Sequence, residues 1–100
     1  METKIEEKEG KFLVCLNGEM DTAAALDAEE ILQPLYKAEG RDVIIECEGL
    51  EYIASSGLRI LLSILKGAKA GGGRVVMRHM NDDIKDVFKL TGFIDLFDFE

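Results

Sequence analysis

The chain has 100 residues, of which 47% are apolar, and carries a formal net charge of −8. This length allows one domain with a sheet and a layer of helices, and the apolar content excludes a disordered chain. The acidic balance argues against non-specific binding to nucleic acid or anionic lipid. No apolar run is long enough to insert into a membrane, and the charged N-terminal residues predict no secretory leader. We therefore expect residues 1–100 to form a single soluble, cytoplasmic domain.

The charges are unevenly distributed along the chain. Residues 1–51 hold 14 acids and 5 bases, whereas residues 52–100 hold 6 acids and 7 bases. No acid occurs from Tyr52 to Asn81, although that segment contains five bases, which are Arg59, Lys66, Lys69, Arg74 and Arg78. These bases are either ordinary solvated side chains or a positive patch that receives an acidic partner or a phosphate.

The first elements are predicted to be strands. Lys11–Asn17 carries apolar residues at both odd and even positions, which is typical of a strand covered on both faces. Thr3–Lys8 can pair with it across a turn at Glu9-Gly10. Gly18 is expected to end the strand.

A helix is predicted over Thr22–Ala38, with Asp21 as its N-cap. Pro34 removes one backbone hydrogen bond and is expected to kink the helix. The residues predicted to form its buried apolar stripe are Leu26, Ile31, Leu32 and Leu35.

The middle of the chain predicts a strand, a loop and a second helix. Val43–Cys47 is rich in β-branched residues and reads as a central strand, and Gly49–Ser56 reads as a loop. From Gly57 to Ala70 the apolar residues follow helical spacing over so wide an arc that the helix should contact the sheet and a second element.

The last third of the chain predicts one more strand and one more helix. The strand covers Arg74–Arg78, and the helix covers Asp82–Leu90 between an Asn81 cap and a Thr91-Gly92 stop. Phe93–Glu100 is compatible with an edge strand or with coil. The order of elements predicts the α/β class, with helices packed mainly on one face of a mixed, four- to five-stranded sheet.

The sequence predicts neither an enzyme nor a metal site. Cys15 and Cys47 lie in apolar runs and are expected to be buried free thiols. His79 is the only histidine and is expected at the surface or at a strand end. No acid, base and nucleophile can be assembled, and no phosphate-binding glycine motif is present, so no cofactor is expected.

The most site-like feature is the segment from Tyr52 to Arg59, where two hydroxyls precede a helix. Ser55 or Ser56 can act simply as an N-cap. Alternatively, one of them can be a phosphorylation switch, because a helix N-terminus stabilises a phosphate and the added charge would repel an acidic partner.

Three segments, taken in order, resemble the STAS domain of bacterial anti-sigma factor antagonists. LVCLNGEMD resembles the first strand and its Gly-x-Leu/Ile-Asp ending. VIIECEGLEYIASSGLRILL resembles the strand and the Asp-Ser/Thr-Ser/Thr-Gly-Leu motif. GGGRVVMRHMNDDIKDVFKLTGFIDLF resembles the Gly-Gly strand and closing helix. The resemblance covers nearly the whole chain and implies the STAS fold.

The resemblance also implies a function and its residues. Members of the family bind an anti-sigma factor that is also a serine kinase, are inactivated by phosphorylation and are restored by a phosphatase. By position the phosphoacceptor is Ser55, with Ser56 as the alternative. The implied partner-binding residues are Gly18, Glu19, Asp21, Ala54, Ser56, Gly57, Leu58 and Arg59.

Two differences from the family pattern leave other possibilities open. The family has Asp before the acceptor, whereas this chain has Ala54. This difference favours an alternative function as a non-phosphorylated STAS accessory subunit of a membrane transport complex of the lipid-trafficking type. Longer members end in a further helix, and an edge left open by its absence would allow weak homodimerisation.

Overall fold

The computed structural model describes residues 1–100, and it begins with a hairpin. Strand β1 (Glu2–Lys8) pairs antiparallel with β2 (Lys11–Met20), and Lys8 lies opposite Lys11. The two turn residues both have positive φ, 54° at Glu9 and 76° at Gly10. That backbone matches the twist of the flanking strands, so the predicted Glu9-Gly10 turn is confirmed.

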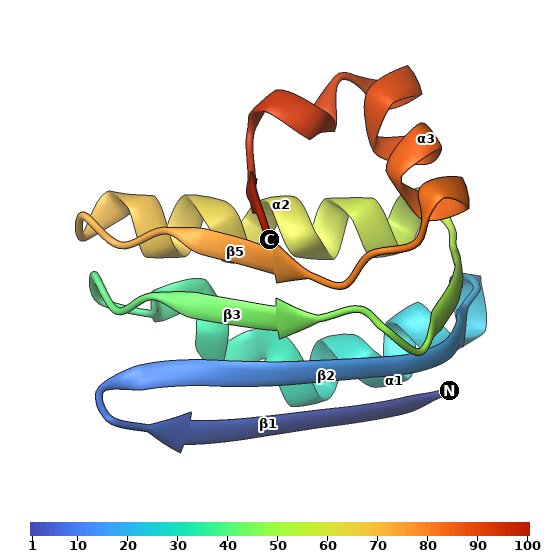
Figure 1. The fold of residues 1–100 in the computed structure, drawn as a ribbon. Helices are drawn as coiled ribbons and strands as arrows, with labels where there is room; N and C mark the ends of the chain where they lie inside the picture. The colour runs from blue at the N-terminus through green and yellow to red at the C-terminus, as the bar shows by residue number, and fades with distance from the viewer.

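The other strands run parallel to β2 in a mixed sheet (Figure 1). The sheet order is β1-β2-β3-β5-β6, where β3 is Val43–Glu46, β5 is Val75–Arg78 and β6 is Asp98–Phe99. A sixth strand, β4 (Leu50–Ile53), pairs with the end of β2 beyond β3. The mixed α/β fold is thus confirmed, with six strands rather than four to five.

Two predicted boundaries in this sheet were wrong. Gly18 does not end β2: its φ of 103° accommodates a register shift, after which the strand continues to Met20 along β4. Most of the segment read as a loop, Gly49–Ser56, is β4 and the start of the next helix. Its LEYI sequence alternates too briefly to be distinguished from a turn, and pairing with β2 makes it a strand.

The first predicted helix is two elements. Helix α1 (Thr22–Leu32) is followed by the 3-10 helix η1 (Gln33–Lys37), with Pro34 in its first turn. Proline is tolerated at the start of a helical segment, so the chain changes helix type there instead of kinking. The buried residues of α1 are Ala25, Ala28 and Leu32, whereas Leu26 is 66% exposed, so the predicted stripe was partly wrong.

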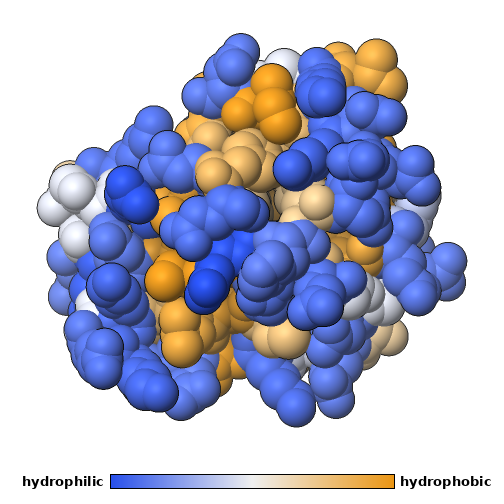
Figure 2. All heavy atoms as spheres, in the orientation of Figure 1, coloured by the Kyte–Doolittle hydropathy of each residue, from blue (hydrophilic) through white to orange (hydrophobic).

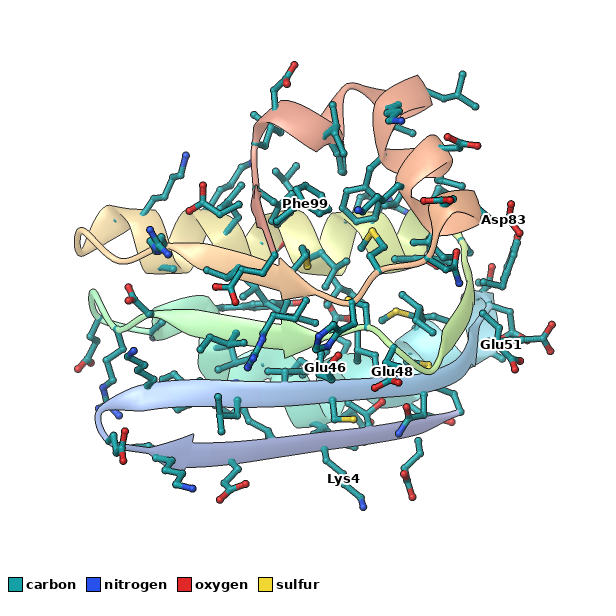
Figure 3. All side chains as sticks on the ribbon, viewed as in Figure 1. Lys4, Glu46, Glu48, Glu51, Asp83 and Phe99 are labelled. Atoms are coloured by element: carbon teal, nitrogen blue, oxygen red, sulfur yellow. The ribbon has the colours of Figure 1, made fainter.

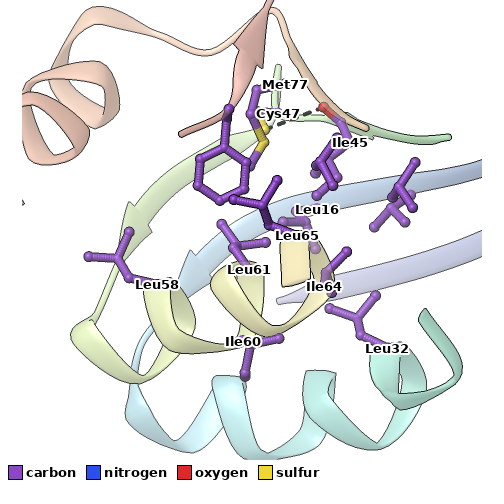
Figure 4. Close-up of a cluster of buried hydrophobic side chains, with 14 of the residues drawn as sticks. Leu16, Leu32, Ile45, Cys47, Leu58, Ile60, Leu61, Ile64, Leu65 and Met77 are labelled. Carbon is purple, nitrogen blue, oxygen red and sulfur yellow. Dashed lines mark hydrogen bonds between the residues drawn. The ribbon is translucent and has the colours of Figure 1, made fainter. Parts of the chain in front are cut away.

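Helix α2 (Ser55–Ala70) lies with α1 on one face of the sheet (Figure 1). Figure 4 shows Leu61 and Leu65 directed toward the strands and Ile60 directed toward α1. All three are buried, so the wide apolar arc contacts both the sheet and a neighbouring helix, as predicted. Gly67 packs so closely on the Tyr36 carbonyl of η1 that a Cβ there would overlap it.

The C-terminal elements form a small aromatic cluster beside β5. Helix α3 (Asp82–Thr91) is followed by a short 3-10 turn, η2 (Phe93–Asp95), and by β6. Phe88 of α3 is fully buried, and its ring centroid lies 5.7 Å from that of Phe97 and 5.9 Å from that of Phe99. The C-terminal strand predicted as one possibility is therefore present and is held in place by edge-to-face aromatic contacts.

The opposite face of the sheet has no helix over it (Figure 1). Hydrophilic side chains cover most of this face, and a strip of apolar surface lies between them (Figure 2). Cys15 is on this face and is half-buried, whereas Cys47 is fully buried. Both thiols are free, as predicted. The predicted burial is confirmed for Cys47 and was wrong for Cys15, because β2 is covered by helices on one face only. No helix is both long and apolar enough to cross a membrane.

Candidate functional site

Two segments predicted to carry function meet at one end of the sheet. Strands β2 and β4 are parallel neighbours, with Met20 opposite Ile53, and the Ala54 amide donates a 2.9 Å hydrogen bond to the Met20 carbonyl. Because the carboxyl ends of parallel neighbours coincide, α1 and α2 both begin here. Glu19 lies opposite Tyr52, and Asp21 follows Met20 next to Ala54, whereas Gly18 pairs with Leu50 at the beginning of β4.

The two helix starts differ in their capping. Asp21 is the N-cap of α1, and its carboxylate accepts a 2.8 Å hydrogen bond from the Ala24 amide, as predicted. The N-cap of α2 is Ala54, which has no side-chain acceptor, and the first turn of α2 contains no acid. The possibility that Ser55 or Ser56 caps the helix was wrong, because α2 begins at Ser55, two residues before the predicted Gly57, and both serines are inside its first turn.

The two serines have different environments. Ser55 is exposed at the first position of α2. The Ser56 hydroxyl oxygen is buried and has no hydrogen-bond partner. A protein kinase needs access to the hydroxyl that it phosphorylates, so the surroundings of these two residues favour Ser55 as an acceptor.

Gly57 and Leu58 anchor the start of α2 in the core. A Cβ on Gly57 would lie 2.8 Å from Cγ1 of Ile53 and 3.0 Å from Sδ of Met20, both buried. Leu58 is 6% exposed. Of the sequence-predicted partner residues that follow Ser56, Arg59 is therefore the one with an exposed side chain.

A hollow between α1 and α2 extends from this junction. Its lining includes Leu26 and Glu29 from α1, and Ser56, Arg59 and Ser63 from α2. Tyr52, three residues before Ser55, is 50% exposed. Neither Leu26 nor Tyr52 was among the predicted partner-binding residues. Leu26 fits a core stripe by spacing, and Tyr52 begins the site-like segment from Tyr52 to Arg59 but lies outside the family motif.

The comparisons with known proteins agree on one family. The family model described as STAS domain matches residues 2–100. The chain belongs to the STAS domain family. It is 28% identical over 97 residues to BtrV of Bordetella bronchiseptica, covering 97% of this chain and 84% of that protein.

Two further matches extend this result. The anti-sigma-B factor antagonist of Staphylococcus aureus is 28% identical over 85 residues, covering 85% of this STAS domain and 79% of that protein. The phosphorylated form of the Bacillus cell fate determinant SpoIIAA superposes with a TM-score of 0.75 at 19% identity, covering 99% of this chain and 91% of that one. The structural match concerns the fold.

The basic residues of this STAS domain do not form one patch. Arg74 pairs with Asp98 at 3.7 Å, and Arg78 pairs with Glu100 at 3.5 Å, both on the helix-free side of the sheet. Arg59, Lys66 and Lys69 are on α2 instead and have no ion-pair partner. The positive patch considered from the sequence is therefore reduced to three bases on α2.

Two ionisable groups have displaced pKa values, and both serve the packing of the domain. Burial raises the pKa of the Cys47 thiol to about 12, with further contributions from Glu46 and Cys15. Burial and a hydrogen bond to Glu29 raise the pKa of Tyr36 to about 12. Neither group is among the residues around Ser55.

Proposed function

We propose that this STAS domain is an anti-sigma factor antagonist that is switched by phosphorylation of Ser55. In its unmodified form it binds an anti-sigma factor that is also a serine kinase. Phosphorylation by that kinase ends the binding, and a phosphatase restores it. The names of its relatives, the family membership and the sequence of motifs support this function.

The observation that carries the proposal is the contrast between the two serines. Ser55 is an exposed residue that a kinase can reach, whereas the Ser56 hydroxyl oxygen is buried. Ser55 also stands at a helix N-terminus without a side-chain cap. A phosphate there would accept hydrogen bonds from the free amides of the first turn. These bonds would stabilise the negative charge of the phosphorylated state.

The same phosphate would disrupt binding through its charge. It adds roughly −1.5 to −2 charges at pH 7. Glu19 and Asp21 already stand beside Ser55, and Arg59 is the base one turn further along α2. A partner surface complementary to the unmodified hydroxyl, Tyr52 and the hollow at Leu26 would then meet a bulky dianion.

The remaining parts of the proposal concern what the domain does not do by itself. It acts by binding rather than by catalysis, and the kinase and phosphatase are separate proteins. Direct binding to nucleic acid is not part of the function. Weak homodimerisation stays a prediction that analytical ultracentrifugation of the purified chain would test.

The decisive experiment measures phosphorylation and binding with the cognate kinase. Mass spectrometry after incubation with ATP should place the phosphate on Ser55 in the wild type and in Ser56→Ala, and Ser55→Ala should remain unmodified. Ser55→Asp should weaken binding by about tenfold or more, whereas the uncharged, similarly sized Ser55→Asn should bind within about threefold of wild type. Equal affinities for these two variants would contradict the switch.

Ala54 supports one alternative function, the non-phosphorylated accessory subunit of a membrane transport complex. The family acceptor is preceded by Asp, and here the preceding side chain is a methyl group. Copurification from the native host discriminates between the two functions: a serine kinase bound to the chain supports the switch, and transporter subunits with an unphosphorylated Ser55 support the alternative.

A further inference from the structure

Three side chains that can bind a metal meet where β3 and β5 end. Glu46 is the last residue of β3, Glu48 follows two residues later, and His79 comes directly after β5. Since β3 and β5 are parallel neighbours with Glu46 opposite Arg78, these positions lie at the same edge. One ligand atom from each residue lies within 4.8 Å of the other two, and Figure 3 shows Glu46 and Glu48 side by side at this edge.

The backbone holds the three residues in this arrangement. Nδ1 of His79 lies 2.8 Å from Oε1 of Glu46, and the Glu48 amide lies 3.4 Å from the same oxygen. His79 has a φ of 56°, an uncommon conformation that histidine adopts more readily than most residues. Its amide donates to the Glu100 carbonyl at 3.3 Å. The position of the imidazole therefore depends on the strands and not on a free loop.

The charges at this edge leave the two carboxylates without a strong cation. Glu46 pairs with His79 alone, and Glu48 has no ion pair. Arg78 is the nearest base by register, and its guanidinium pairs with Glu100 at 3.5 Å. The Glu46 side chain is 32% exposed and that of His79 is 59% exposed, so an ion from solvent can reach both.

We propose that Glu46, Glu48 and His79 bind a first-row divalent cation of the zinc class. An imidazole selects such metals over Mg²⁺ and Ca²⁺, which prefer oxygen ligands, and two carboxylates neutralise the charge of the ion. Zinc–ligand bonds of about 2.0–2.1 Å place tetrahedral donor atoms about 3.3 Å apart. The Glu46–His79 pair would open slightly to accept the ion, and Glu48 would move in by rotation of its exposed side chain. Water would complete the coordination.

The bound ion would connect the segment after β3 to the segment after β5. The proposed function gives no role to this connection. Glu48 lies in the connection from β3 to β4, and β4 leads to Ser55. His79 lies between β5 and the Asn81 cap of α3. An ion bridging these residues would fasten the β3–β4 connection to the start of the C-terminal elements.

Zinc titration of the untagged full-length chain tests this site. His79 is the only histidine, so its ring ¹⁵N signals report on the imidazole without assignment. The titration is done in a Cys15→Ser background, because Cys15 is opposite Glu46 on the same face and a thiol also binds zinc. We expect one equivalent of Zn²⁺ to bind by calorimetry and to shift one ring nitrogen, with no displacement by a tenfold molar excess of Mg²⁺ over Zn²⁺.

Matched variants separate this site from general binding to an acidic surface. His79→Gln and Glu48→Gln should each weaken Zn²⁺ binding by about tenfold, because each removes one of three protein ligands. Glu51→Gln removes the same charge from an exposed residue that points away from the cluster and should bind as wild type does (Figure 3). Amide spectra confirm that the variants fold. Three results would overturn the proposal. They are an unchanged zinc affinity in His79→Gln, ring signals that do not shift when zinc binds, and an affinity that falls as much in Glu51→Gln as in Glu48→Gln.

Discussion

Helices α1 and α2 begin side by side at the same end of the sheet, yet their first turns are built differently. Asp21 caps α1 with a 2.8 Å hydrogen bond to the Ala24 amide. Ala54 precedes α2 and provides no acceptor. Helix α3 follows the first pattern, since the Asn81 side chain accepts from the Ile84 amide at 2.9 Å. Of the three α-helices, α2 alone lacks a side-chain cap, and it carries the exposed serine.

This difference separates a structural helix start from one suited to a switch. A side-chain cap already occupies one of the first-turn amides, so a new anion gains less there, and at α1 it would also meet the charge of Asp21. An uncapped N-terminus keeps its amides available for a phosphate. If this comparison is correct, removing the caps of α1 and α3 should destabilise the domain, and adding negative charge at α2 should stabilise it.

The largest effect is expected at Asn81, which holds two elements together. Its Oδ1 caps α3, and its Nδ2 donates to the Leu50 carbonyl of β4 at 3.1 Å. Asn81→Ala should lower the free energy of unfolding by about 2 kcal/mol, as measured by urea denaturation. Asn81→Asp keeps the capping acceptor and loses the donor to Leu50, so its unfolding free energy should lie between those of the wild type and Asn81→Ala. A wild-type midpoint in Asn81→Ala would contradict a structural role for the cap.

Removing the cap of α1 should have a smaller effect. Asp21 makes one capping bond in an exposed setting, so Asp21→Ala should cost about 1 kcal/mol of unfolding free energy. Asn is as good an N-cap as Asp, and Asp21→Asn should restore most of the loss. If Asn fails to restore it, the carboxylate acts through its charge rather than through the cap.

Creating a cap at α2 tests the other side of the comparison. Ala54→Asp should raise the unfolding free energy by about 0.5–1 kcal/mol, because its carboxylate can accept from a free amide of the first turn. Glu19 and Asp21 are close by, so repulsion reduces the gain. The uncharged Ala54→Ser separates capping from repulsion and should be at least neutral. A loss of stability in both variants would mean that the α2 amides are not available.

Much of this architecture was predictable from local sequence signals. The Glu9-Gly10 hairpin, the caps at Asp21 and Asn81 and the stop at Gly92 depend on interactions within a few residues. The wide apolar arc of α2 likewise predicted contacts with both the sheet and a helix. These features are specified by side chains close to one another in the chain, so a single sequence is enough to find them.

The errors arose where distant segments decide the local structure. Strand β4 exists because Leu50–Ile53 pairs with β2, and nothing within its four residues requires a strand. Leu26 is exposed because the side of α1 that faces the core is formed by Ala25, Ala28 and Leu32. The small alanines let the helix approach its neighbours closely. The two errors concern exposed apolar residues near the first turns of α2, namely Tyr52 and Leu26.

The candidate sites differ in the same way. The resemblance pointed to Ser55 by position, and the burial of the Ser56 hydroxyl, which depends on tertiary packing, separates the two serines. Glu46 and His79 are 33 residues apart, so their 2.8 Å contact could not be predicted from the spacing of residues in the sequence. A lone histidine was therefore read as a surface or strand-end residue, and only the parallel pairing of β3 and β5 brings the carboxylates to it.

The smallest stability effect, and the one that links the comparison to function, is expected at Ser55. Ser55→Asp places a charge at the first position of α2, where a helix N-terminus stabilises an anion, and should add about 0.5 kcal/mol of unfolding free energy relative to Ser55→Asn. Salt should reduce the gain, because the charge is exposed to solvent. The same variant is expected to bind the kinase more weakly. A domain that becomes more stable while its binding weakens would locate the loss at the interface and exclude unfolding as its cause. If Ser55→Asp instead destabilises the domain at low salt, the α2 start does not accommodate an anion, and the Ser55 switch would have to act without help from the helix.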